Sequence, residues 1–195
     1  NVSPDTHTQV PGLKHKLSDR VKVCSLGTGA MINGLKPDFD LVIEFSDVTT
    51  EDVLMLTREL NLRDTTQTTL SALERSFGKE NWFQSFMKLK NGEGEGTVSE
   101  WAESNNVNVA AAESLQSKLN RLYHKPYMVE KMPYNVVSQI ISALQNGTSV
   151  ILSFGKYQSD LDYLLAANIL TRKVRAAWEK RTEENAAGNG PKPTP

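Results

Sequence analysis

Residues 149–181 combine an apolar segment, a glycine-lysine pair and a long helical pattern, in that order. The apolar residues at 150–152 are consecutive, which is typical of a β-strand that is covered on both faces. Ser159 and Asp160 are good helix-capping residues, and the pattern after them is apolar nearly all round before it becomes amphipathic. A sheet covered on both faces needs helices on each side. This segment therefore predicts an α/β fold.

Two earlier segments also have strand patterns. Residues 20–26 alternate between two faces, and a glycine-rich connection at 26–34 follows them. In residues 39–45 the apolar positions recur at every second residue, and Val42 on the other face suggests burial on both sides. The sequence thus predicts three strands, at 20–26, 39–45 and 150–152.

From Thr49 onward the apolar period becomes helical. Thr49 is expected to cap the first helix, with Asp52 in its first turn, and Gly78 is expected to end the next one. "TVSE" at 97–100 predicts a capping box, in which Thr97 accepts from the amide three residues on and Glu100 reaches back. The predicted helical stripes contain Val53, Leu56, Leu60, Leu70, Leu73, Phe77, Trp82, Phe83, Phe86, Met87, Ala112, Leu115, Leu119, Leu122, Val137, Ile140, Ile141 and Leu144.

Short links between these helices are typical of a small helical bundle inserted into the α/β core. We expect residues 1–48 to be a sheet segment, 49–132 the helical bundle, and 133–184 a helix-strand-helix segment that returns to the core. Residues 185–195 are rich in glycine and proline, which is typical of a disordered terminus and equally of a linker that leads toward a further strand. Both ends of the sequence look cut rather than finished.

The composition limits the class of protein. With 195 residues and 38% hydrophobic content the chain can fill a core, and its net charge of −1 excludes an overall basic field for nucleic acid. The single cysteine, Cys24, excludes an internal disulfide and fits a reducing compartment. The sequence has no apolar run of about 18 residues and no signal peptide pattern, so we expect a cytoplasmic protein without a membrane span.

Two glycine segments suggest phosphate binding at first sight. A phosphate-binding P-loop needs G-x-x-x-x-G-K-[ST]. Gly155-Lys156 has no glycine five residues before Gly155, and Tyr157 follows where the motif needs Ser or Thr. The loop at 26–34 has its third glycine too far along for G-x-G-x-x-G, and no helical pattern follows it. We interpret the first as a strand-to-helix corner and the second as a loop.

The sequence offers no catalytic, metal-binding or cofactor-binding set. His7, His15 and His124 are scattered, and no nucleophile has its partners at a recognisable spacing. Asp38, Asp40 and Glu44 flank the second strand. Asp40 with Glu44 could serve a metal or a general base, although carboxylates at strand edges are usually solvated. Asn146-Gly147-Thr148 fits a glycosylation pattern, but we interpret it as a helix end.

The best binding candidate is a basic stretch on the last helix. Five basic residues spread over more than one face of that helix: Arg172, Lys173, Arg175, Lys180 and Arg181. Such a stretch can contact nucleic acid or a neighbouring subunit. It is also typical of a solvated helix end, where basic groups suit the negative end of the dipole.

The segment from Ser149 onward resembles the HerA-like ATPases, hexameric DNA translocases of the HerA/FtsK branch of P-loop proteins. That family has an F-G-x-Y type turn after a hydrophobic strand, and then a helix of the form D-Y-x-x-x-x-N-x-[IL]-x-R-[RK]. The matching residues in this sequence are Phe154, Gly155, Tyr157, Asp162, Tyr163, Asn168, Leu170, Arg172 and Lys173. Residues 21–29 and 39–56 also look like the family's segment that leads into a helical insert.

The resemblance implies a partial P-loop ATPase core with an inserted bundle, from a parent that binds ATP and magnesium. It places the Walker A loop before Asn1 and the Walker B strand after Pro195, so this chain alone is expected to be inactive. It also implies a homo-oligomer, a hexameric ring around duplex DNA that acts in DNA processing or repair, and a nuclease as a possible partner. Arg172 or Arg175 could then act as an arginine finger, although no motif assigns that role.

An alternative from another class is a non-enzymatic helical domain that binds a protein partner. Its contact features would be the acidic, glycine-rich segment 91–96 and Trp101, which has an exposed-looking position in the sequence pattern. Trp101 could equally pack inside the bundle. The two hypotheses differ in whether the parent protein hydrolyses ATP.

Overall fold

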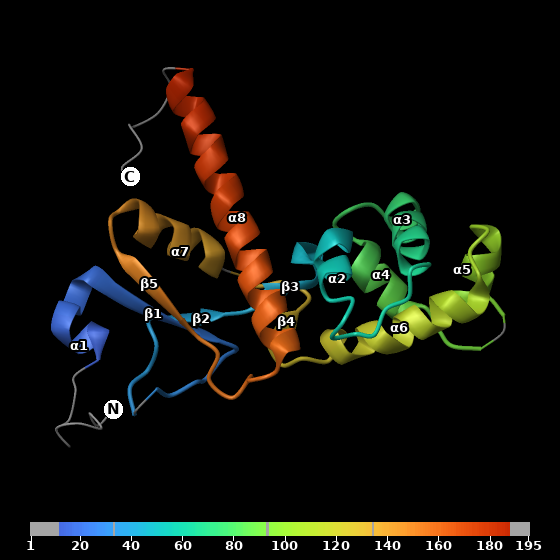
Figure 1. Cartoon of the computed structure of the whole chain (residues 1–195), viewed down its shortest axis with the longest axis horizontal. Helices are drawn as coiled ribbons and strands as arrows, with labels where there is room; N and C mark the ends of the chain where they lie inside the picture. Colours follow the sequence, from blue (N-terminus) through green and yellow to red (C-terminus); the bar gives the residue numbers. More distant parts are fainter. Residues whose placement is uncertain (1–11, 33, 93, 134, 188–195) are drawn as a thin grey trace. The chain divides into compact units, whose positions relative to one another are not determined.

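The computed structural model describes residues 12–32, 34–92, 94–133 and 135–187. The chain has an α/β fold, in which small parallel sheets are combined with many helices (Figure 1). It divides into two compact units. The sheet unit comprises residues 1–41, 134–156 and 172–195, and the helical unit comprises 42–133 and 157–171. The last helix, α8 (Asp160–Ala186), contributes residues to both units.

A three-stranded parallel sheet forms the centre of the sheet unit, with the strand order β2-β1-β5. Helix α7 packs against β2 and β5, and α1 packs against β1. The elements of this unit other than α8 are α1 (Leu13–Leu17), η1 (Ser18–Arg20), β1 (Val21–Leu26), β2 (Phe39–Leu41), α7 (Val136–Gln145) and β5 (Ser149–Ser153). Cys24, Leu26 and Leu41 are buried in its core.

Strand β5 corrects one prediction. The run at 150–152 was expected to be covered on both faces, yet Ile151 is 36% exposed, and Val150 and Leu152 are only half-buried. Within the described residues, β5 pairs with β1 and has no strand on its other side. An edge strand lacks the second neighbour whose side chains would help to cover it, and this explains the exposure.

The predicted strand at 39–45 is in fact two short strands in different sheets. β2 ends at Leu41, and β3 (Ile43–Glu44) pairs in parallel with β4 (Met128–Val129), a strand that the sequence pattern did not indicate. Residues 45–47 continue as the 3₁₀ helix η2 (Phe45–Asp47). Val42, at the change of sheet, is buried as expected.

The helical unit is built around α6, which packs against α3, α4 and α5 (Figure 1). Most of the predicted stripe residues between 53 and 122 form its core, and Trp82, Phe83 and Phe86 are almost completely buried, while Phe77 and Met87 are half-buried. The Trp82 indole donates to the Val48 carbonyl oxygen at 3.0 Å. The helices are α2 (Thr50–Met55), α3 (Thr66–Phe77), α4 (Trp82–Lys88), α5 (Val98–Ser104), α6 (Val109–Tyr123) and the first part of α8.

The local signals at helix ends are mostly confirmed. The Thr49 hydroxyl accepts from the Asp52 amide at 3.2 Å, and the Asp52 carboxylate accepts from the Thr49 amide at 2.9 Å. Gly78 ends α3 with φ +80°, a conformation that favours glycine. The box at 97–100 is only half correct, because the Glu100 carboxylate accepts from the Gly96 amide at 2.6 Å rather than from Thr97.

Candidate functional site

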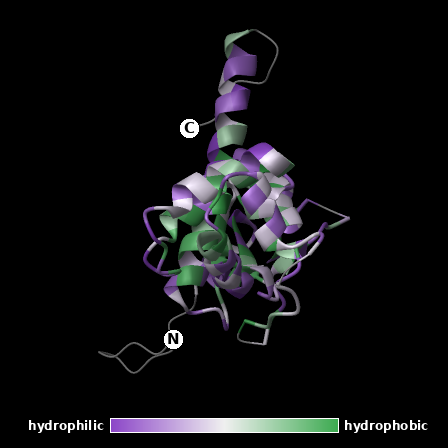
Figure 2. Cartoon of the chain, turned by 90° about the vertical axis from the view of Figure 1, so that its right-hand side faces the viewer, coloured by the Kyte–Doolittle hydropathy of each residue, from purple (hydrophilic) through white to green (hydrophobic). Residues whose placement is uncertain are grey.

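The basic stretch lies in the part of α8 that belongs to the sheet unit. Figure 2 shows that α8 is mostly hydrophilic toward its C-terminal end. Arg175 Nε donates to the Glu179 carboxylate at 2.7 Å, and Lys180 Nζ lies 3.9 Å from the Glu184 carboxylate. Arg172, Lys173 and Arg181 are half-buried. This surface of α8 is therefore mixed in charge, because acidic residues one turn on offset part of the basic charge.

The corner between β5 and α8 requires glycine for its backbone. Gly155 has φ +55°, in the left-handed region that L-residues other than glycine adopt only at a cost. A Cβ at Gly155 would lie 3.9 Å from Ser25 Oγ, so the space itself would admit a methyl group. The conformation of Gly155 accounts for the glycine without a phosphate ligand.

Asp162, the first residue of the helix motif quoted above, lies inside the helical unit and is 3% exposed. Its carboxylate accepts from Tyr127 Oη at 2.7 Å and from Ser159 Oγ at 2.6 Å, and Lys125 Nζ lies at 2.8 Å. Burial raises the pKa of Asp162, but the hydrogen bonds from Lys125, Ser159 and Tyr127 outweigh it and hold that pKa below its usual value. Burial and the neighbouring Asp162 raise the pKa of Tyr127 far above its usual value.

Asn168, a second motif residue, also bonds within the helical unit. Its Nδ2 donates to Asp52 Oδ1 at 2.6 Å, and Asp52 is the residue that completes the capping box of α2. Asp162 and Asn168 therefore attach the first half of α8 to two other segments of this unit. The sequence did not indicate their partners, which lie 35 and 116 residues away along the chain.

Two of the three carboxylates around the second predicted strand, Asp38 and Glu44, accept a hydrogen bond of 3.0 Å or less from a backbone amide. Asp38 accepts from the Val23 amide at 2.8 Å and pairs with Lys14 and Lys22. Burial raises the pKa of Asp38, but the bonds from Lys14 and Val23 hold it below its usual value. Glu44 accepts from the Met132 amide at 3.0 Å. Asp40 differs, because its nearest donor is the Gly29 amide, 3.5 Å from Oδ2.

The other candidates are not gathered into a site. His15 and His124 are exposed, and His7 lies outside the described residues. Cys24 is buried, and burial together with the charge of Asp40 raises its pKa to about 12. Within the part of the chain that the structure describes, no three His, Cys, Asp or Glu side chains are placed to hold a metal ion.

Trp101 corrects the expectation of an exposed contact residue. It is 8% exposed, and its indole donates to Ser76 Oγ at 3.2 Å, with Phe77 and Phe86 nearby. The segment 91–96 closes on itself, because the Lys90 amide donates to the Gly96 carbonyl oxygen at 2.9 Å. The interaction-domain hypothesis thus loses the aromatic residue on which it depended.

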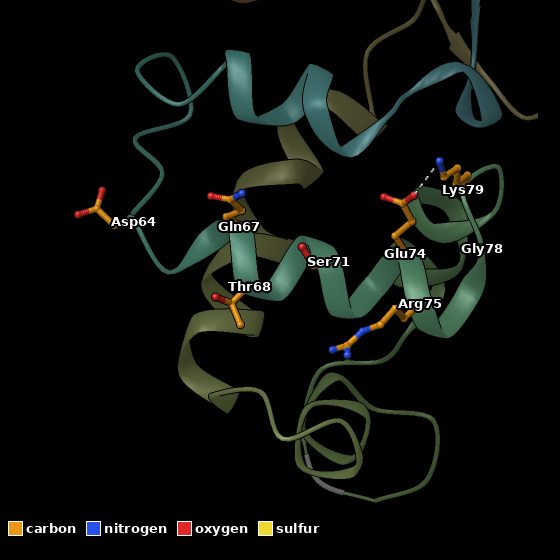
Figure 3. A pocket seen from close by; sticks show the side chains of 8 residues that line it. All are labelled: Asp64, Gln67, Thr68, Ser71, Glu74, Arg75, Gly78 and Lys79. Atoms are coloured by element: carbon orange, nitrogen blue, oxygen red, sulfur yellow. Dashed lines mark ion pairs between the residues drawn. The ribbon is translucent and has the colours of Figure 1, made fainter.

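A hollow of about 780 Å³ runs along α3 (Figure 3). All of its lining residues come from 64–79, so one helix and its flanks form the whole lining. Glu74 pairs with Lys79 at 3.7 Å and accepts from the Thr50 hydroxyl at 2.9 Å. A lining from a single helix leaves the hollow open, and we assign no ligand to it.

Comparisons of the chain with protein-family models, curated proteins and solved structures found no match. Among the described residues, no helix is both long enough and apolar enough to cross a membrane.

Proposed function

We propose that this chain is the central segment of a HerA-like, ATP-driven DNA translocase of the P-loop class. In this proposal the sheet unit belongs to the ATPase core, and the helical unit is its inserted bundle. The parent protein binds ATP and magnesium through Walker motifs in flanking sequence, and it forms a ring around duplex DNA.

The observation that carries the proposal is the role of the motif residues in α8. A motif of the form D-Y-x-x-x-x-N on a surface helix would be unremarkable, but here Asp162 and Asn168 are both bonded inside the helical unit. They follow a parallel strand and a corner with a left-handed glycine. Two of the residues on which the resemblance depends, Asp162 and Asn168, thus have a physical reason for their identity, because they bond the first half of α8 to other segments of the helical unit.

The first test is the ATPase activity of the parent protein. We expect flanking coding sequence with G-x-x-x-x-G-K-[ST] on the N-terminal side and an apolar strand that ends in acidic residues after Pro195. The protein that includes both should hydrolyse ATP faster with duplex DNA, whereas residues 1–195 alone should show no turnover. A stop codon directly after Pro195, or turnover by this chain alone, would refute the proposal.

The second test concerns the basic stretch. In the parent protein, a Lys173→Glu, Arg175→Glu double variant should weaken duplex DNA binding and reduce its dependence on salt. A protein that makes fewer phosphate contacts releases fewer counterions when it binds DNA. The matched control is Arg75→Glu with Lys79→Glu, at the C-terminal end of α3 and just after it, which should leave DNA binding unchanged. Equal loss in both double variants would indicate a general charge effect rather than a DNA-contacting surface on α8.

A further inference from the structure

Three polar side chains form a row across the carboxyl end of the β2-β1-β5 sheet. The register pairs Ser25 of β1 with Asp40 of β2 on one side and with Ser153 of β5 on the other. Residues paired across adjacent strands project from the same face of a sheet. Ser153, Ser25 and Asp40 therefore share one face, and all three belong to the sheet unit.

Among the described residues, two oxygens of this row are buried and have no hydrogen-bond partner: Ser25 Oγ and Asp40 Oδ1. Ser25 as a whole is 0% exposed, and Asp40 as a whole is half-buried. Asp40 has no ion pair with any described residue, whereas Asp38, two residues earlier, pairs with Lys14 and Lys22. A buried carboxylate oxygen is costly unless it is hydrogen-bonded, paired or bound to a metal. These two oxygens therefore lack a partner that would satisfy them, although the Gly29 amide reaches the other oxygen of Asp40 at 3.5 Å.

The position of the row is the one at which parallel sheets bind ligands. β1 lies between β2 and β5. The chain runs from β1 to β2 on one side, and it later passes through α7 to β5 on the other side. Ligands of open parallel sheets bind beyond the carboxyl ends of the strands at such a switch point. The loops after β1 and β5 both bring glycine there: Gly29 with φ +71°, and Gly155, whose added Cβ would lie 3.9 Å from Ser25 Oγ.

We propose that Asp40 and Ser25, with Ser153 beside them, hold a hard divalent cation of the magnesium type. The donors are all oxygens, the ligand class that such cations prefer. Both unpartnered oxygens are buried, which favours a ligand as small as an ion, and Asp40 as a whole is only half-buried, which leaves a side of the ion for water. Magnesium is commonly held by one or two carboxylates, with water or phosphate oxygens in its other positions, so a single carboxylate suffices here.

Manganese titration of the full chain, followed by electron paramagnetic resonance of the free ion, tests the proposal. We expect a single site from which magnesium displaces manganese. Asp40→Asn should weaken it by about tenfold or more and Ser25→Ala by a smaller factor, since loss of a group at a metal site commonly costs about 10- to 100-fold in affinity. Asp38→Asn is the matched control, because Asp38 already pairs with two lysines, and it should retain the site.

A second measurement needs no variant and therefore does not depend on whether Asp40→Asn folds. In the wild-type chain, manganese should broaden the amide resonances of Ser25, Gly29 and Gly155 before those of the acidic segment 94–100. No uptake of manganese, unchanged affinity in Asp40→Asn, or broadening that begins at 94–100 would each overturn the proposal.

Discussion

At the scale of single residues, the most consequential side chain is Asp162. Replacing it by asparagine leaves Lys125 without its carboxylate in a largely buried place and weakens the bonds from Tyr127 and Ser159. We expect Asp162→Asn to lower the free energy of unfolding by about 3 kcal/mol, as for other buried pairs that lose one partner. Urea unfolding followed by far-ultraviolet circular dichroism measures this.

The control for that substitution is Glu130→Gln. Glu130 pairs with Lys88 at 3.5 Å, and both side chains are more than half exposed. Solvent screens an exposed pair, so this variant should unfold close to the wild type. A similar decrease in the free energy of unfolding in both variants would mean that the Asp162 contacts do not owe their stabilising effect to burial.

The lowered pKa of Asp162 also predicts how the stability of the chain depends on pH. The pKa of Asp162 is lowered in the folded chain, so its contribution to stability is complete above the unfolded value, about 3.9. That contribution is lost as the pH falls below this value and through the folded pKa. The difference in unfolding free energy between wild type and Asp162→Asn should therefore be constant near neutral pH and shrink below about pH 4. A difference that stays constant into strong acid would contradict this assignment.

At the scale of elements, the outer edge of β5 is the exposed feature. Ser149–Ser153 contains no proline and no charge, the devices that usually protect an edge strand. We expect Ile151→Lys to slow aggregation of the chain, measured by light scattering on heating, with a change in stability of about 1 kcal/mol or less. Leu164→Lys is the matched control on a helix, since Leu164 is 41% exposed, and it should slow aggregation less.

The elements also show which parts of the fold could be predicted from sequence. The stripes of α3, α6 and α7, and the caps at Thr49 and Gly78, depend on residues within one or two turns. The helices, the caps and most of the stripe residues were predicted correctly, but Phe77, Ile141 and Leu144 are only half-buried. The division of 39–45 between two sheets was not, because β3 finds its partner at Met128, far along the chain. Likewise, three apolar residues in a row do not reveal that β5 is an edge strand.

The candidate site divides in the same way. The sequence showed the carboxylates and the glycines as residue types, but it did not show which carboxylates have hydrogen-bond or ion-pair partners. Asp38 and Asp40 differ only in what surrounds them: two lysines and an amide for the first, and one long bond from Gly29 for the second. Ser25 carried no sequence signal, since a serine inside a strand pattern is common, and only its burial without a partner makes it a candidate.

At the scale of the whole molecule, α6 of the helical unit and β5 of the sheet unit differ in how completely they are buried. In α6, Leu119 and Leu122 are 0% exposed, whereas β5 is partly exposed along its length. We expect backbone amides in the middle of α6 to exchange with deuterium more slowly than those of β5, because local opening of α6 must expose more apolar surface. Mass spectrometry of peptides from both segments measures this, and faster exchange in α6 would contradict it.

The three tryptophans are divided between the units in a useful way. Trp82 and Trp101 are buried in the helical unit, whereas Trp178 lies half-buried in the part of α8 that belongs to the sheet unit. A buried indole fluoresces at shorter wavelength than one in contact with water. The natural sequence therefore contains separate optical reporters for its two units, and Trp178→Phe leaves emission from the helical unit alone.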